Sequence, residues 1–97
     1  MCKSDVFNRI LEIVAQETEV AAEEIIGKGR TIEVVDARRI LFFLLRKEGM
    51  YPSQIAKKTH KTSAAVRYLL SDVQERISAN SMIEKTLKKV QKQLENN

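Results

Sequence analysis

The chain has 97 residues, of which 43% are apolar and 31% charged, and its formal net charge is +4. These values predict one small, folded domain spanning residues 1–97, and they are not typical of a disordered chain. The single cysteine, Cys2, excludes an internal disulfide and, with one histidine, a Cys/His zinc cluster, so we expect a terminal free thiol and a reducing, cytoplasmic location.

The first third of the chain predicts one long helix, one short helix and a loop. Ser4 is a candidate N-cap with Asp5 in the first turn, and apolar residues follow at helical spacing over residues 6–14. A short helix is expected at about Ala22–Ile26. The glycine-rich basic segment GKGRT, residues 27–31, then predicts a turn.

Three more helices are expected in the middle of the chain. The most apolar run, ILFFLL, is six residues long against the roughly 20 of a membrane span, so it predicts a buried helix over Glu33–Glu48 ending at Gly49. Pro52 suits the first position of a fourth helix that ends near Thr59. Thr62 is the expected N-cap of a fifth helix that reaches about Ile77.

The last predicted helix begins at a capping box formed by Ser81 and Glu84. Its apolar residues repeat at intervals of four, three and four: Ile83, Leu87, Val90 and Leu94. Lysines occupy the opposite face: Lys85, Lys88, Lys89 and Lys92. This pattern fits a helix that closes the bundle, a homodimer or protein-partner seam with coiled-coil spacing, or a lysine stripe on DNA or an acidic lipid surface. The fold class expected is all-α, a compact bundle of about six helices.

The fourth and fifth helices resemble a helix-turn-helix. Ala56 and Val66 are ten residues apart, as are the small residue and the buried aliphatic residue that let the two helices of that motif cross closely. Projection at 100° per residue places the aliphatic residues of the fifth helix on one face and Ala64, Tyr68 and Ser71 on the other. In such a motif the N-terminal part of the second helix enters the DNA major groove.

Several residue types at this position suit contact with DNA, although any helical bundle also presents a solvated face of this kind. Hydroxyls and backbone N–H groups at the helix start suit phosphate, alanines suit a thymine methyl, and arginine or tyrosine suits a base edge or phosphate. The single histidine, His60, is expected in the turn rather than at a metal. The candidates in this segment are Lys61, Thr62, Ser63, Ala64, Ala65, Arg67 and Tyr68.

The charge is unevenly distributed along the chain. Residues 1–27 carry two basic and six acidic side chains, a net charge of −4. Residues 28–76 carry eleven basic and five acidic side chains, a net charge of +6, and residues 77–97 carry four and two, a net charge of +2. A basic middle segment favours a polyanionic partner such as double-stranded DNA.

Over about residues 5–90 the chain resembles the C-terminal DNA-binding domain of the bacterial replication initiator DnaA. The segments EEIIGKGRTIEVVDARRI, residues 23–40, and PSQIAKKTHKTSAAVRYLLSDV, residues 52–73, carry the resemblance. It implies an all-helical, Trp-repressor-like fold and a basic loop that places an arginine in the minor groove. Lys28 and Arg30 match that loop, and Arg38 matches an arginine expected to contact the DNA backbone.

The chain departs from this family at the start of the recognition helix, where the family signature G-R-D-H-[ST]-T-V is replaced by KTSAAV. Lys61 keeps the charge of the arginine, Thr62 replaces the aspartate and Ser63 replaces the base-reading histidine. Phosphate contacts position such a domain, so DNA binding is still expected, whereas recognition of the initiator's usual box is not implied. Nothing resembles a phosphate-binding loop, so we expect a free-standing relative or an isolated C-terminal piece without ATPase activity.

Two function classes other than DNA binding are also considered for this sequence, an interaction adaptor and an enzyme. A protein-interaction adaptor or transcriptional regulator that kept the fold is compatible with the lost signature and the alanines that replace it. An enzyme is disfavoured because the chain has one histidine, one cysteine and no carboxylate pair whose spacing suggests acid–base catalysis. No cofactor, metal, small-molecule substrate or membrane contact is expected.

Overall fold

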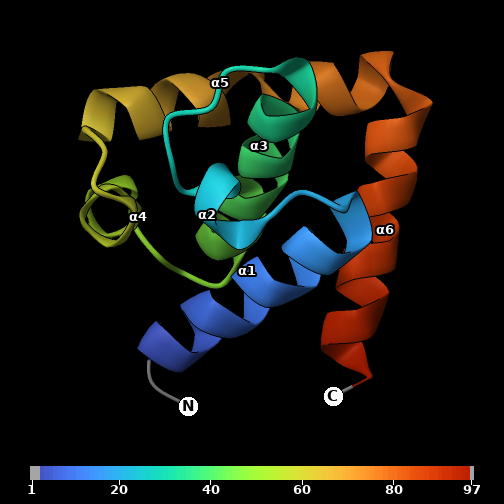
Figure 1. The fold of residues 1–97 in the computed structure, drawn as a ribbon, viewed down its shortest axis with the longest axis horizontal. Coiled ribbons are helices and arrows are strands. Elements are labelled where there is room, and N and C mark those ends of the chain that lie inside the picture. The colour runs from blue at the N-terminus through green and yellow to red at the C-terminus, as the bar shows by residue number, and fades with distance from the viewer. Residues whose placement is uncertain (1–2, 97) are drawn as a thin grey trace.

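The computed structural model describes residues 3–96, which form an all-helical fold without strands; Cys2 lies outside this range. Figure 1 shows the arrangement of these helices. In chain order they are α1 (Lys3–Thr18), α2 (Ala22–Ile25), α3 (Ile32–Lys47), α4 (Pro52–Thr59), α5 (Ser63–Ala79) and α6 (Ser81–Glu95). The predicted all-α bundle of about six helices is therefore confirmed.

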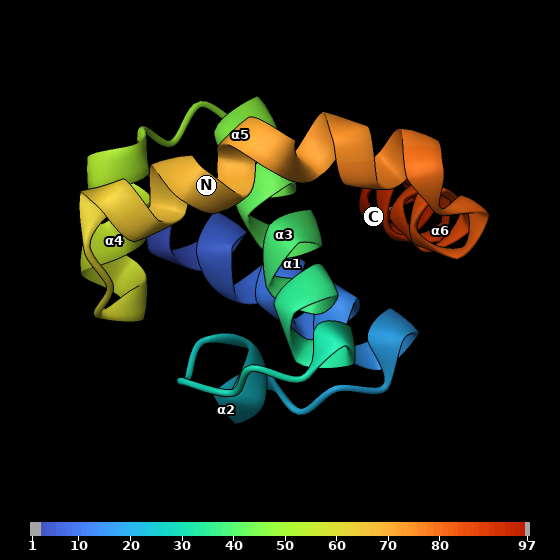
Figure 2. The same cartoon turned by 90° about the horizontal axis from the view of Figure 1, so that it is seen from above.

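α3 is the central helix, and the other helices pack around it (Figures 1 and 2). Its apolar run is buried, with Leu41, Phe42 and Leu45 at 0% exposure. α1 crosses one side of α3, while α5 lies across the opposite side and α4 lies at one end of the assembly. Burial on several sides explains why this segment is apolar nearly all round rather than along one stripe. None of the helices in the described range is long and apolar enough to cross a bilayer.

α6 closes the bundle through apolar residues whose spacing in the sequence also fits a dimer seam. Ile83, Leu87 and Val90 are 7%, 7% and 0% exposed and belong to the same core as α1 and α3. Arg9 of α1 also donates from Nη2 to the carbonyl oxygen of Leu94 at 3.0 Å. The homodimer alternative therefore loses the surface it needed, since spacing alone does not distinguish an intramolecular seam from an intermolecular one.

Of the four helix N-termini for which the sequence predicts a cap or a first residue, two agree with the structure. Thr62 caps α5 by accepting a hydrogen bond from the backbone N–H of Ala65 at 3.1 Å. Pro52 occupies the first position of α4, as predicted. At the end of α3, Gly49 follows the C-cap with a φ of 96°, a left-handed conformation that favours glycine.

The other two predicted caps are wrong. α1 already includes Lys3, so Ser4 lies within the helix rather than before it. At α6, Asn80 is the N-cap and its Oδ1 accepts from the N–H groups of Met82 and Ile83 at 2.9 and 3.4 Å. Asparagine is as good an N-cap as serine, and its position one residue earlier removes Ser81 from that role; Glu84 instead pairs with Lys88 at 3.1 Å.

α4 and α5 form the helix-turn-helix that the sequence predicts. Ala56 and Val66 are 4% and 0% exposed, so the small residue and the aliphatic residue both lie in the core between the helices. His60 ends α4 with a φ of 55°, and the backbone N–H of Lys61 donates to the carbonyl oxygen of Ala56 at 2.9 Å. The chain thus reverses within a few residues and leaves the first turns of α5 at the surface.

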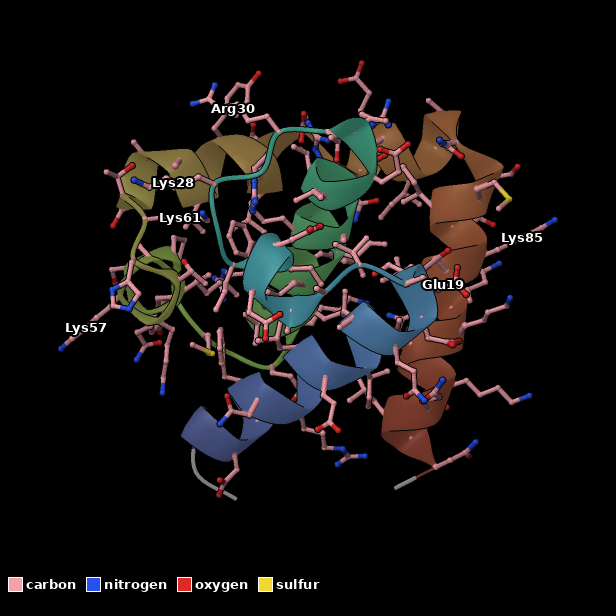
Figure 3. All side chains as sticks on the ribbon, viewed as in Figure 1. Glu19, Lys28, Arg30, Lys57, Lys61 and Lys85 are labelled. Carbon is pink, nitrogen blue, oxygen red and sulfur yellow. The ribbon has the colours of Figure 1, made fainter. Side chains whose placement is uncertain are left out.

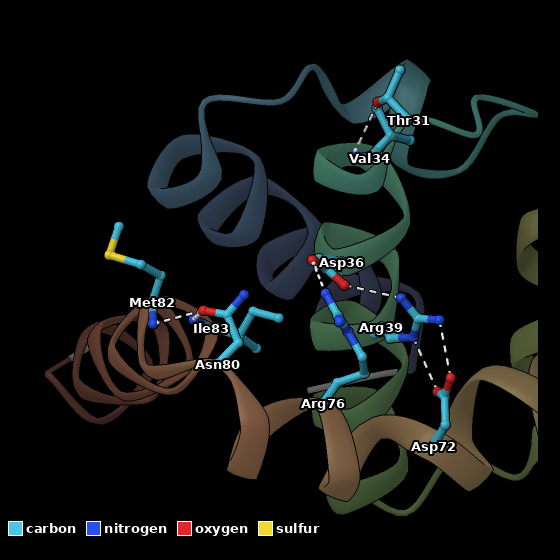
Figure 4. Close-up of polar contacts among 9 residues, drawn as sticks. All are labelled: Thr31, Val34, Asp36, Arg39, Asp72, Arg76, Asn80, Met82 and Ile83. Carbon is cyan, nitrogen blue, oxygen red and sulfur yellow. Dashed lines mark hydrogen bonds and ion pairs between the residues drawn. The ribbon is translucent and has the colours of Figure 1, made fainter.

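Ion pairs fix the second half of α5 on α3 (Figure 4). Arg39 donates from Nε and Nη2 to both carboxylate oxygens of Asp72 at 3.0 Å, and from Nη1 to Asp36 at 2.9 Å. Arg76 donates from Nη2 to the other oxygen of Asp36 at 2.9 Å. Burial alone lowers the pKa of Arg39, but the hydrogen bonds and charges of Asp72 and Asp36 more than offset it and leave that pKa raised. This network joins the second half of α5 to α3.

Candidate nucleic-acid interface

A groove of about 650 Å³ separates the basic loop, residues 27–31, from the first turns of α5. Figure 3 shows Lys28 and Lys61 beside it, Arg30 at the loop, and Lys85 on the far side of the molecule. No Asp or Glu is among the residues that line this groove. Most of the residues predicted to bind DNA do line it: Lys28, Arg30, Arg38, Lys61, Thr62 and Tyr68.

The remaining predicted residues lie on the outer face of α5. Ala64 and Arg67 are exposed and Ser63 is half-buried. Tyr68 is 69% exposed, although it also lines the groove. Within the described range no carboxylate is paired with Arg67. The first turns of α5 therefore present small side chains, one unpaired cation and one aromatic ring to the solvent.

The loop holds its two cations outward because its glycines let it fold tightly against α2 and α3. A Cβ atom on Gly27 would lie 2.6 Å from the carbonyl oxygen of Glu23, which only glycine avoids. A Cβ on Gly29 would lie 3.1 Å from Cγ1 of Val34, closer than an ordinary contact. Lys28 and Arg30 flank Gly29 and are both exposed.

Arg38 lies beneath this loop rather than at the surface, where a contact with the DNA backbone was expected. Its side chain is only 7% exposed. Its Nε donates to the carbonyl oxygen of Ile25 at 2.6 Å, and its Nη2 to those of Glu24 at 3.1 Å and Gly27 at 3.0 Å. The carbonyls of Glu24 and Ile25 lie at the end of α2 and that of Gly27 in the turn after it; the carbonyl of Glu24 also accepts from the backbone N–H of Gly27 at 3.2 Å. Burial lowers the pKa of Arg38, and a contact with DNA stays a prediction for this residue.

Lys61 also contacts the loop. Its Nζ donates a hydrogen bond to the carbonyl oxygen of Gly27, the same atom that accepts from Arg38. The pKa of Lys61 is lowered first by its burial and then by the nearby charges of Arg38 and Lys28. The side chain of Lys61, in the turn before α5, is therefore directed at the loop.

Thr62 and the residues after it form a helix N-terminus at the edge of the groove. The side-chain oxygen of Thr62 accepts from the N–H of Ala65, so the hydroxyl is used as a cap. The N–H groups of Ser63 and Ala64 have no acceptor within the helix, because the first turn of any α-helix lacks one. Such an end attracts phosphate oxygens.

The family of the chain follows from a match over most of its length. Residues 7–73 match the family described as the bacterial DnaA protein helix-turn-helix. The chain belongs to this DnaA family. The matched residues include the basic loop, α3, the turn before α5 and the first half of α5, each of which contributes residues to the lining of the groove. No curated protein matches the chain.

Membership in the DnaA helix-turn-helix family confirms the resemblance found in the sequence. The family is one of DNA-binding domains rather than of catalytic ones. The match ends at Val73, so α6 lies outside it. The structure adds that α5 of this DnaA-type domain is held by the ion pairs of Asp72 and Arg76, close to where the match ends.

Sequence reasoning missed the bonds that hold the DnaA-type basic loop. The shortness of α2 was a signal for such bonds. A helix of four residues leaves nearly all of its carbonyls without donors inside the helix, so the donors come from elsewhere. The sequence does not show which cation supplies them. Among the described residues no group of His, Cys, Asp and Glu suits a metal ion.

Proposed function

We propose that residues 3–96 bind duplex DNA on their own, without enzymatic activity. The start of α5 enters a major groove, the basic loop enters the adjacent minor groove, and the DNA strand between them lies along the groove that separates loop and helix. One observation carries this proposal: that groove is lined by Lys28, Arg30, Arg38 and Lys61 and by no carboxylate. A surface of this charge attracts phosphates, which supply most of the affinity of DNA-binding domains.

The cations differ in what they offer to DNA. Arg30 and Lys28 are exposed on the loop and suit the minor groove, where arginine is attracted by the negative potential of narrow A·T-rich segments. Arg67 is exposed on the outer face of α5 and suits a phosphate or a guanine edge. The free N–H groups at Ser63 and Ala64 suit a phosphate oxygen.

Recognition of the initiator's box is not part of this proposal. Thr62 and Ser63 stand where the family has an aspartate and a histidine, and Thr62 is used as a cap. The side chains left to distinguish bases are Ser63, Arg67 and the methyl groups of Ala64 and Ala65. We therefore expect the affinity for duplex DNA to depend less on the base sequence than on phosphate contacts.

Duplex titration followed by fluorescence anisotropy at several salt concentrations tests the proposal. With some six phosphates contacted, the log–log slope of affinity against salt is expected to be about −5. Arg30→Ala is expected to weaken binding to all sequences about tenfold, whereas Lys85→Ala, which removes an exposed lysine on the far side, is expected to have little effect. Absence of binding at low salt would overturn the proposal.

One observation favours a second candidate, a protein-interaction adaptor. Tyr68 is 69% exposed beside two exposed alanines, an apolar patch on the face that would otherwise meet DNA. Selection of duplexes from a random pool separates the candidates. An enriched motif that is lost in Ser63→Ala or Arg67→Ala supports sequence-specific DNA binding, and retention of no duplex at low salt supports the adaptor.

A further inference from the structure

The basic loop and the recognition helix are connected through a single backbone oxygen. The carbonyl oxygen of Gly27 accepts from Nη2 of Arg38 at 3.0 Å and also from Nζ of Lys61. Arg38 belongs to α3, and Lys61 lies in the turn directly before α5. Three parts of the fold therefore meet at this atom: the loop, the central helix and the leading end of the recognition helix.

Neither cation has a carboxylate as hydrogen-bond partner within residues 5–96; their donors are directed at backbone oxygens. Two positive charges on one neutral carbonyl repel each other, so the charges alone do not explain the arrangement. The bonds do satisfy the carbonyls of Ile25, the last residue of α2, and of Gly27 in the turn after it. Ile25 is buried and Gly27 half-buried, and carbonyls in such positions are costly to leave unpaired. The geometry therefore indicates that these two side chains hold the loop in place.

We propose that Arg38 and Lys61 are positioning residues that hold the basic loop at a fixed position relative to α5 before DNA binds. Arg30 then lies at the right place for the minor groove when α5 occupies the major groove. This inference rests on the proposed DNA binding and adds a role that differs from direct phosphate contact. Ordering the loop beforehand raises affinity because less conformational freedom is lost on binding.

The alternative role for Lys61 is a direct bond to phosphate, and the two roles predict different couplings. A positioning lysine acts through Arg30, so removing both residues costs less than the sum of the separate losses. A lysine that binds its own phosphate acts independently of Arg30, so the losses add. It also lowers the salt slope by about 0.9 when it is removed.

A double-mutant cycle on the whole chain tests this, with a labelled duplex selected by the wild type as the probe. We expect Arg30→Ala to weaken binding about tenfold in the wild type and about threefold or less in Lys61→Met. Adding Lys61→Met to Arg30→Ala is expected to leave the salt slope unchanged. Lys85→Met is the matched control, since it removes the same charge far from the loop, and its loss is expected to add to that of Arg30→Ala.

Hydrogen exchange of the backbone amides gives a second measurement that needs no DNA. Lys61→Met is expected to speed exchange at residues 28–31 several-fold, and Lys85→Met is expected to leave it unchanged. Arg38→Met is less suitable, because loss of its buried bonds threatens the fold itself. Additive losses in the cycle, or unchanged loop exchange, would overturn the inference. If the wild type binds no duplex, the proposed function fails, while the exchange experiment still tests whether Lys61 holds the loop in place.

Discussion

The two halves of α5 use their charges in opposite ways. In the second half, Asp72 pairs with Arg39 at 3.0 Å and Arg76 pairs with Asp36 at 2.9 Å, so these two charges are matched by side chains of α3, while Glu75 is exposed. In the first half, Arg67 is exposed and no carboxylate is paired with it in the part of the chain that the structure describes. One half of the helix is thus fixed to the bundle, and the other half presents unmatched charge to the solvent.

This difference fits the proposal that one helix serves both the fold and DNA binding. Ion pairs that are half-buried and bidentate hold geometry, whereas an exposed cation adds little to stability and remains available to a phosphate. Substitutions in the second half should therefore change the free energy of unfolding. Substitutions in the first half should change DNA affinity instead.

The largest effect is expected from Arg39→Met, which leaves Asp72 without its partner and Asp36 with one partner only. The side chains of Arg39, Asp36 and Asp72 are 11%, 14% and 29% exposed, so the free energy of unfolding should fall by about 2–3 kcal/mol, somewhat less than for a fully buried pair. Urea denaturation measures this change. As a control, Lys88→Met removes the exposed pair with Glu84 and should cost less than about 0.5 kcal/mol. An equal loss in both variants would contradict the comparison.

The next effect is on DNA affinity and compares two arginines of the same helix. Arg67→Ala should weaken duplex binding about tenfold and leave the free energy of unfolding within about 0.5 kcal/mol of the wild type. Arg76→Met should lower the free energy of unfolding and leave duplex affinity unchanged, because Arg76 lies in the second half of α5 and its Nη2 is bound to Asp36 of α3. Anisotropy titration and urea denaturation on both variants check this. If Arg76→Met loses affinity while Arg67→Ala does not, the assignment of the two halves is wrong.

A smaller effect is expected at the first residue before α5. Thr62→Ala removes the oxygen that accepts from the N–H of Ala65, and the loss of such a cap costs about 1 kcal/mol. Thr62→Ser keeps the oxygen and should restore the stability. Thermal unfolding of the three proteins measures the difference. A loss that serine fails to restore would mean that the methyl group of Thr62, rather than its hydroxyl, matters for stability.

The fold was largely predictable from the sequence because its signals are local. Helical spacing of apolar residues, Pro52 and the cap at Thr62 each depend on a few neighbouring residues, and all agree with the structure. At Asn80 and Ser81 two good caps are adjacent, and the sequence does not show which of them adopts the extended backbone that a cap requires.

The surroundings of the candidate site were less predictable because they depend on contacts between distant residues. Arg38 looks like any surface arginine in the sequence, and its burial depends on α2 lying over it, 11 to 14 residues away along the chain. Lys61 lies 34 residues from the carbonyl it contacts. The burial of the apolar residues of α6 likewise depends on where α1 lies, which no local sequence pattern indicates.

The smallest effect concerns pH and Lys61, the residue that links the loop to the unpaired half of α5. Its pKa in the folded protein is lowered from the ordinary value of 10.5, first by burial and then by the charges of Arg38 and Lys28. Just below pH 10.5 the unfolded chain therefore binds more protons at this residue than the folded chain, so stability rises with pH there. Urea denaturation across this alkaline range should show the wild type gaining stability relative to Lys61→Met as the pH rises. A difference that stays constant would show that Lys61 keeps its ordinary pKa, and a difference that shrinks would show that its pKa is raised; either result would contradict the prediction.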